Sequence, residues 1–316
     1  MTITQLQYVL AVAEHRNFTL AAEKCFVTQP TLSMQVQKLE DELDIQIFDR
    51  GKKPISITES GQKIVDQARN IVNEAARIRD IVDQEKGYIG GTYTLGIIPT
   101  VMPTLLPMFL KTFIDRYPKV HLVIREQNTD QIIRNLAEGH LDAGIAATPL
   151  EREFIVERPL YYEPFVAYTP SGHRLAASGK LNPEALDLGD ILLLEDGHCF
   201  RDGVINLCKT TGQDAQAGFQ LQSGSFETLL NLADEQMGMT LLPYLHTVGL
   251  DEKRKANLRF FEDPPPAREV SLIYHKKELK HQITEALQGV IAAVVRGAIT
   301  FQDVKLISPT LSRKAS

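Results

Sequence analysis

The chain has 316 residues, 43% of them hydrophobic and 23% charged, which is typical of a globular protein with two or three domains. Its formal net charge of -6 excludes a general electrostatic attraction to nucleic acid, so DNA binding would need a local basic surface. The longest apolar runs are too short to cross a bilayer, and the first residues lack the pattern of a signal peptide. We therefore expect a cytoplasmic protein without a membrane partner.

The first 58 residues predict a winged helix-turn-helix domain. Apolar residues at helical spacing predict three helices, over residues 3–15, 18–25 and 29–42. Thr28 is in position to cap the third helix, and Pro30 stands in its first turn, where a missing N–H costs nothing. The alternation around Ile55 and Ile57, next to a turn rich in Gly, Pro and basic residues, predicts a two-stranded wing.

Polar and basic side chains of this domain form a candidate DNA interface. Glutamine can bond adenine through two hydrogen bonds in the major groove, and Ser or Thr can bond bases or phosphates. Basic residues at the tip of the wing can bind phosphates or an adjacent minor groove. The candidates are Gln29, Pro30, Thr31, Ser33, Gln35, Lys38, Arg50, Lys52 and Lys53. The alternative is a solvated polar face with a basic turn, and the helical pattern alone favours neither.

Residues 59–86 predict one long helix, on the order of 40 Å in length. Apolar or small side chains recur along it at alternating steps of four and three residues, at Ile64, Ala68, Ile71, Ala75, Ile78 and Val82. This is the a/d pattern of a coiled coil and favours a dimer seam. The alternative is packing of the helix against its own chain.

From residue 87 to residue 302 the sequence predicts two α/β lobes. Strands at 93–98, 121–126 and 141–146 alternate with helices at 105–117 and 130–138, which implies a parallel sheet. A second set has strands at 165–168, 191–194, 219–222, 239–242 and 270–274 and helices at 227–236 and 281–296. Two lobes joined by two crossings of the chain would leave a ligand cleft at the carboxyl ends of the strands. We expect residues 303–316 to be a flexible tail.

Three cysteines are present: Cys25, Cys199 and Cys208. They are too few for a disulfide scaffold, and their spacing fits no zinc site, so we expect neither a metal nor a cofactor. In a reducing compartment a disulfide is usually transient, catalytic or sensing. Cys25 ends an apolar helical segment and is predicted to be a core residue without redox function.

The segment from Glu195 to Asp202 places Cys199 between His198 and Arg201. A turn precedes Cys199, so we expect the thiol at a helix N-terminus, where the helix dipole and neighbouring cations favour a reactive thiolate. Cys208 follows nine positions later and could resolve an oxidised Cys199. The alternative is two unrelated buried thiols.

The same spacing predicts a conformational switch. Nine helical steps would separate the two Cα atoms by about 13 Å. A disulfide needs them within ~7 Å. A bridge between Cys199 and Cys208 would therefore require this segment to refold, and a segment with two alternative structures is what a switch needs.

Several motifs together identify a family. In the first domain they are Phe18-Thr-Leu-Ala-Ala22, Thr28-Gln-Pro-Thr-Leu-Ser33, Gln37-Lys-Leu-Glu40, Phe48-Asp-Arg50 and Thr58-Glu-Ser-Gly61; in the lobes they are Gly96–Thr100, Leu194–Asp202, Phe226–Leu229 and Gly238–Pro243. In these motifs and in domain order, the chain resembles the LysR-type transcriptional regulators. The segment around Cys199 is similar to that of the family's hydrogen peroxide sensors.

The resemblance implies a periplasmic-binding-protein-like effector domain and a regulator that is not an enzyme. It also implies the partners: an operator in double-stranded DNA, further copies of the chain in a homodimer or homotetramer, RNA polymerase, and glutaredoxin or thioredoxin as reductant. Cys199 would be oxidised by peroxide to a sulfenic acid and Cys208 would close the disulfide, in control of oxidative-stress genes. Two rivals remain: a regulator of this family that binds a small organic metabolite in its cleft, and a thiol peroxidase.

The resemblance further implies a peroxide pocket around Cys199. Its candidate residues are Thr100, Thr129, His198, Arg201, Asp202 and Arg268. Both threonines follow predicted strands, where they would face the cleft and could hold peroxide or relay a proton. The alternative for each threonine is an N-cap of the next helix, and for Arg268 it is a surface cation.

Overall fold

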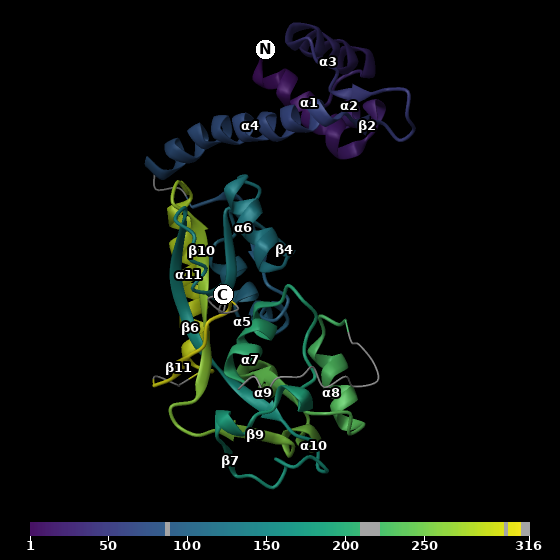
Figure 1. The fold of residues 1–316 in the computed structure, drawn as a ribbon. Helices are drawn as coiled ribbons and strands as arrows, with labels where there is room; N and C mark the ends of the chain where they lie inside the picture. The colour runs from purple at the N-terminus through teal and green to yellow at the C-terminus, as the bar shows by residue number, and fades with distance from the viewer. Residues whose placement is uncertain (86–88, 209–221, 300–302, 311–316) are drawn as a thin grey trace. The chain divides into compact units, whose positions relative to one another are not determined.

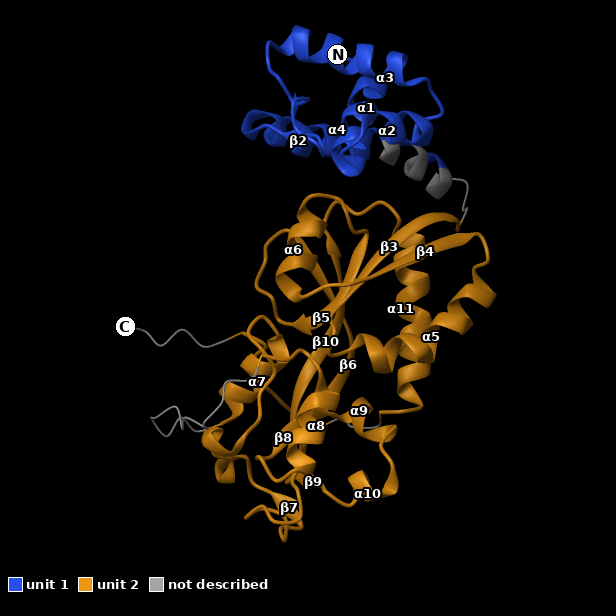
Figure 2. Cartoon of the chain, turned by 90° about the vertical axis from the view of Figure 1, so that its right-hand side faces the viewer, with its two compact units in different colours: residues 1–88 blue, residues 89–316 orange. Residues whose placement is uncertain are grey.

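The computed structural model describes residues 1–85, 89–208, 222–299 and 303–310. The chain forms two compact units, residues 1–88 and residues 89–316 (Figure 2). Each unit has its own hydrophobic core, and the second unit has two core clusters. No helix in the described part of the chain is both long and apolar enough to cross a membrane.

The first unit is the predicted winged helix-turn-helix followed by the long helix. Its elements are α1 (Ile3–His15), α2 (Phe18–Lys24), α3 (Gln29–Leu43), β1 (Phe48–Asp49), β2 (Ser56–Ile57) and α4 (Glu59–Glu85). The two short strands pair antiparallel and form the wing. Thr28 stands at the N-cap position of α3 but makes no capping bond, and its hydroxyl is hydrogen-bonded to that of Thr31.

The apolar stripe on α4 has two different environments. Near the start of the helix, Ala68 is buried, and Ile64 and Ile71 pack against the core of the first unit. Further along, Ile78 and Val82 are 65% and 44% exposed. The first part therefore packs against its own chain, as the alternative expected, whereas Ile78 and Val82 in the later part are exposed apolar side chains.

The second unit contains the predicted parallel run. Strands β3 (Gly91–Ile97), β4 (Val120–Glu126) and β5 (Ala143–Thr148) are parallel, with α5 (Met102–Arg116) and α6 (Thr129–Ala137) between them. The sheet continues in the order β4-β3-β5-β10-β6-β9-β7. The strands β3, β4 and β5 and the helices α5, α6 and α11 (His281–Arg296) enclose the larger core cluster, and we call this part of the unit the first lobe.

Two long antiparallel strands, β6 (Ile155–Tyr168) and β10 (Pro266–His275), join the lobes and run side by side (Figure 1). Tyr161 and Val270 belong to the first core cluster, whereas Phe165 lies in the second. The sequence predicts only the apolar ends of both strands, because charged residues such as Glu163 interrupt the strand pattern.

The second lobe surrounds the second core cluster. Its elements are β7 (Lys180–Leu181), two 3-10 helices (Pro183–Ala185 and Leu188–Asp190), α7 (Cys199–Leu207), α8 (Phe226–Asp234), β8 (Thr240–Pro243), α9 (Tyr244–Val248), α10 (Glu252–Lys255) and β9 (Leu258–Phe261). The predicted strand at 191–194 is wrong, since only a single bridge joins Ile191 to Met239. Of the predicted strand at 219–222, residues 219–221 lie outside the described residues.

Residues 303–310 differ from the expected flexible tail. Strand β11 (Lys305–Leu306) pairs parallel with β10, and the Ile307 amide donates to the carbonyl of Ala267 at 2.8 Å. The side-chain amide of Asn206 on α7 donates to the carbonyls of Ser308 and Thr310 at 3.1 and 2.7 Å. This segment therefore packs against the helix that begins with Cys199. Residues 311–316 lie outside the described part.

Two neighbouring substitutions should show how firmly this segment is held. Ile307 packs against the second core cluster, so Ile307→Ser should lower the free energy of unfolding by about 1–2 kcal/mol. Leu306 is 50% exposed, and Leu306→Ser should change the free energy of unfolding by less than about 0.5 kcal/mol. Urea unfolding of both variants measures the difference; equal effects would contradict this packing.

Candidate functional site at Cys199

Cys199 is the first residue of α7, as predicted, with His198 at the N-cap position. The turn before it places Gly197 at φ +91, a conformation that side chains with a Cβ rarely adopt. The Cys199 sulfur lies 2.9 Å from the hydroxyl of Thr129, the first residue of α6 in the first lobe. Cys199 packs against the first core cluster, whereas the following Phe200 belongs to the second. The thiol therefore lies where the two lobes meet.

A buried arginine completes this site. Arg268 on β10 is only 3% exposed, so its interpretation as a surface cation is wrong. Its guanidinium donates to the hydroxyl of Thr100 at 2.9 Å and to the carbonyl of Thr100 at 3.1 Å. It also donates twice to one carboxylate oxygen of Glu163, at 3.0 and 2.7 Å, and lies 5.0 Å from the centre of the Phe200 ring.

The capping alternative for the two threonines is also wrong. The N-cap positions of α5 and α6 are held by Val101 and Asn128. The Asn128 side chain accepts from the Gln131 amide, and the Gln131 side chain accepts from the Asn128 amide, which forms a capping box. The hydroxyls of Thr100 and Thr129 are bonded instead to Arg268 and to the sulfur.

The surroundings of the Cys199 thiol disfavour its charged form. Burial raises its pKa above the ordinary thiol value, because the charged form loses its hydration. The hydrogen bond with Thr129 lowers the pKa, the charge of Asp202 raises it and the charge of Arg268 lowers it. Since burial is the largest effect, the expectation of a stabilised thiolate is wrong for this form of the protein.

His198 and Arg201 do not supply the positive charge that the sequence suggested. Arg201 is paired with Asp196 at 2.9 Å and also donates to the carbonyl of Leu194. The His198 ring lies 3.7 Å from the carboxylate of Glu195. Both side chains are thus engaged with the preceding loop, and the cation that acts on Cys199 comes from β10. Sequence reasoning missed Glu163 altogether, since a charge inside a strand gives no signal of its own.

Cys208 stands at the C-cap of α7, at the other end of the helix from Cys199. It is 6% exposed and lies in the second core cluster, and burial raises its pKa to about 12. Both thiols are free. The two sulfurs therefore belong to different cores at opposite ends of one helix, so a bridge between them requires α7 to unwind. Cys25 is also free and packs against the core of the first unit.

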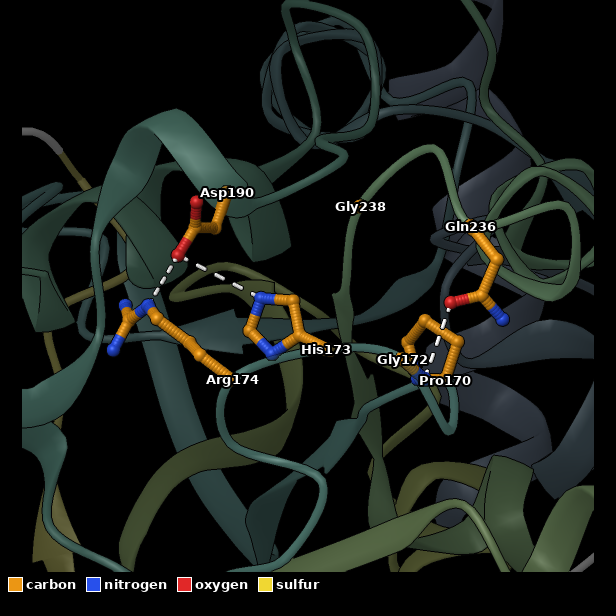
Figure 3. A pocket seen from close by; sticks show the side chains of 7 residues that line it. All are labelled: Pro170, Gly172, His173, Arg174, Asp190, Gln236 and Gly238. Atoms are coloured by element: carbon orange, nitrogen blue, oxygen red, sulfur yellow. Dashed lines mark hydrogen bonds and ion pairs between the residues drawn. The ribbon is translucent and has the colours of Figure 1, made fainter.

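A separate hollow of about 260 Å³ lies in the second lobe and contains none of the predicted site residues. It is lined by Pro170, Gly172, His173, Arg174, Asp190, Gln236 and Gly238 (Figure 3). Asp190 is bonded to Arg174 at 2.7 Å and lies 3.6 Å from His173, and Gln236 accepts from the amide of Gly172. The polar groups of this hollow are directed at one another, so it is a weaker candidate than the Cys199 site.

Most of the candidate DNA-binding residues are exposed, and Arg50 is engaged within the domain. Gln29, Pro30, Thr31, Lys38, Lys52 and Lys53 are exposed, and Ser33 and Gln35 are half-buried. Arg50 instead donates to the buried carboxylate of Glu40 at 2.7 Å and lies over the ring of Phe18. Glu40 also accepts from the amides of Ile47 and Phe48. Arg50 therefore holds the wing to α3.

Replacing Arg50 tests that role. Arg50→Ala should lower the free energy of unfolding by about 1–2 kcal/mol, because it removes a charge-assisted bond to a carboxylate that is only 5% exposed. Arg50 is itself 34% exposed, which keeps the effect below that of a fully buried pair. Thermal unfolding is the measurement. Lys53→Ala is the control: it should leave stability unchanged while weakening DNA binding, and equal stability losses would contradict this assignment.

Comparisons with known proteins agree with this organisation. Residues 3–62 match the family model for bacterial regulatory helix-turn-helix proteins of the lysR family, and residues 86–296 match the LysR substrate binding domain. The chain is 34% identical to the DNA-binding transcriptional dual regulator OxyR of Escherichia coli K12 over 300 residues, which cover 92% of this chain and 95% of that protein.

Solved structures give the same result. A full-length cysteine variant of OxyR from Pseudomonas aeruginosa superimposes with a TM-score of 0.75 at 32% identity, covering 92% of this chain and 98% of the other. A cysteine variant of Corynebacterium glutamicum OxyR with hydrogen peroxide bound has a TM-score of 0.61 at 28% identity, covering 96% and 98%. With both domains matched and the relatives aligned over nearly its whole length, the chain belongs to the LysR-type transcriptional regulators, in the OxyR group.

Proposed function

We propose that the protein is a DNA-binding transcription regulator that senses hydrogen peroxide through Cys199. The observation that carries the proposal is the 2.9 Å contact between the Cys199 sulfur and the Thr129 hydroxyl. This contact lies at the junction of the lobes, where the charge of Arg268 also acts on the sulfur. The relatives named as hydrogen peroxide-inducible genes activators support the same oxidant.

The chemistry balances without a cofactor. The Cys199 sulfur attacks one peroxide oxygen and the O–O bond breaks, giving a sulfenic acid and a leaving oxygen that takes up the thiol proton to become water. The Thr129 hydroxyl is close enough to relay that proton, and the Arg268 guanidinium stabilises negative charge on the leaving oxygen. The Cys208 thiol then displaces the hydroxyl group of the sulfenic acid as a second water and closes the disulfide.

The second step links oxidation to a change of structure. Because α7 separates the two cysteines by its full length, it must unwind before the sulfurs can meet. Unwinding disrupts the contact of Phe200 with Arg268 and the bonds of Asn206 to Ser308 and Thr310. Oxidation therefore breaks contacts between the lobes and with the C-terminal segment. This rearrangement alters how the regulator engages DNA and controls oxidative-stress genes.

The remaining partners follow from the same proposal. The exposed residues of α3 and the wing bind the operator, and the DNA-bound regulator acts on RNA polymerase. Glutaredoxin or thioredoxin reduces the disulfide in the cytoplasm, and the chains form a homotetramer in which α4 makes one of the contacts. A protein molecule that has reacted with one peroxide must have its disulfide reduced by a partner before it can react again. The protein therefore acts as a stoichiometric sensor rather than a peroxidase.

The self-association of α4 has its own test. Ile78→Asp places a charge on a side chain that is 65% exposed in the isolated chain. If α4 forms a dimer seam, the variant should self-associate at least tenfold more weakly in sedimentation equilibrium, because the seam would bury an unpaired carboxylate. Unaltered association would exclude this face of α4 from the interface.

Peptide mapping combined with footprinting tests the function itself. The reduced protein is treated with about one equivalent of hydrogen peroxide and bound to the DNA upstream of its own gene. The expected result is a disulfide-linked pair of peptides containing Cys199 and Cys208, together with a footprint that differs from that of the reduced protein. If both thiols stay free while the footprint is unaltered, the proposal is wrong.

A further inference from the structure

We propose that Glu163 is a positioning residue for the peroxide reaction: it holds the Arg268 guanidinium in place beside Cys199 and thereby sets the rate at which the thiol is oxidised. The inference rests on the proposed function, since it concerns the same site. It goes further by giving a role to a buried carboxylate that touches neither the sulfur nor Thr129.

Both oxygens of the Glu163 carboxylate accept hydrogen bonds from neighbouring groups. The residue is 1% exposed, and one of its oxygens accepts from two nitrogens of Arg268 at 3.0 and 2.7 Å. The other oxygen accepts from the backbone amide of Leu245, near the start of α9, at 2.9 Å. Glu163 thus fixes the guanidinium from one side while being anchored to α9 on the other.

The same contacts define which part of Arg268 is left for a substrate. A guanidinium has five N–H groups. Two of those of Arg268 point to Glu163 and two to Thr100, one of the latter from Nη1 to the Thr100 hydroxyl. Among the described residues, no bond uses the second N–H of Nη1. The pairing with Glu163 therefore fixes the direction of the one N–H of Arg268 that the described residues leave for a substrate oxygen.

The electrostatic pattern agrees with an indirect role. The charge of Arg268 lowers the pKa of the Cys199 thiol, and the Glu163 carboxylate is bonded to Arg268 and to the Leu245 amide instead of to the sulfur. Glu163 and Arg268 face one another in the antiparallel register of β6 and β10. A buried guanidinium without a carboxylate would be an uncompensated charge and would move toward solvent or another acceptor. Glu163 influences Cys199 through the position of Arg268.

Glu163→Gln tests this role, because it keeps the shape of the side chain but removes its charge. The rate constant for oxidation of Cys199 by hydrogen peroxide should fall at least tenfold. The pH midpoint for alkylation of Cys199 by iodoacetamide should rise, since a displaced Arg268 no longer lowers the thiol pKa. An unchanged rate with an unchanged midpoint, or a midpoint that falls, would overturn the proposal.

Further variants separate positioning from general destabilisation. In an Arg268→Met background, Glu163→Gln should slow oxidation no further, because there is no guanidinium left to hold; independent, multiplicative losses would contradict the inference. Asp142→Asn is the matched control. Asp142 forms a partly buried ion pair with Lys280 at 2.9 Å, so this variant should lose stability while its Cys199 rate stays that of the wild type.

A second variant and a measurement that needs no peroxide keep the test decisive. If Glu163→Gln does not fold, Glu163→Asp keeps the charge but shortens the reach by one methylene, and the same fall in rate and rise in midpoint are expected. Alkylation needs no peroxide. If the wild type forms no disulfide, the proposed function fails, while the alkylation midpoints still report whether Glu163 acts on Cys199.

Discussion

Cys199→Ser should abolish the response to hydrogen peroxide, and Cys208→Ser should stop the reaction at the sulfenic acid. A serine hydroxyl cannot form the sulfur–oxygen bond, so the first variant should keep the DNA footprint of the reduced protein at any peroxide dose. In the second variant Cys199 keeps its contact with Thr129 and can still be oxidised, but no thiol remains at position 208 to displace the hydroxyl group. Dimedone labelling followed by mass spectrometry distinguishes the two.

Cys25→Ser is the matched control for both variants, since Cys25 packs against the core of the first unit. It should retain the full peroxide response and the disulfide between Cys199 and Cys208. A response that persists in Cys199→Ser, or dimedone labelling on Cys25 in place of Cys199, would show that another group senses the oxidant.

The alkylation rate of Cys199 should depend steeply on pH through the neutral range. Its pKa is raised by burial, so the thiol is mainly protonated at pH 7, and below its pKa the thiolate fraction grows tenfold for each pH unit. Between pH 7 and pH 9 the rate of reaction with iodoacetamide should therefore rise by about a hundredfold. The measurement is the loss of the free-thiol peptide with time at each pH.

Thr129→Val extends this test. The hydrogen bond with Thr129 lowers the pKa of Cys199, so its removal should move the whole curve to higher pH. The same peptide in denaturant is the reference, and its midpoint should lie below that of the folded protein, because the unfolded thiol is hydrated. A rate that is already at its plateau at pH 7 would show that the folded protein holds a thiolate, and would contradict the effect of burial.

A raised pKa of the Cys199 thiol is compatible with a selective sensor. A buried thiol with a raised pKa reacts slowly with bulky or charged electrophiles, whereas peroxide is small and brings its own proton acceptor as the O–O bond breaks. The hydroxyls of Thr129 and Thr100 and the guanidinium of Arg268 supply polar groups at that position. We therefore expect discrimination among oxidants to depend more on these neighbours than on the acidity of the thiol.

The local parts of this molecule could be predicted from its sequence. The three helices of the first domain, the long α4 and the parallel run of the first lobe follow apolar periodicity, which depends on neighbouring residues only. The start of α7 at Cys199 follows from the turn that precedes it. The spacing to Cys208 then determined that the two cysteines stand at opposite ends of one helix.

The set of side chains that meet at the Cys199 sulfur depends on packing between distant segments. Thr129 contacts Cys199 across 70 residues of sequence, and Arg268 contacts Thr100 across 168 and Glu163 across 105. The nearby cations, His198 and Arg201, were the obvious candidates, yet acids of the preceding loop engage them. Local sterics and burial patterns specify the helices of the first domain, α4, the parallel strands of the first lobe and the spacing of Cys199 and Cys208, so these follow from the sequence. The partners of Cys199 and the state of its proton depend on strand register and on burial between lobes, which arise only when distant segments pack together.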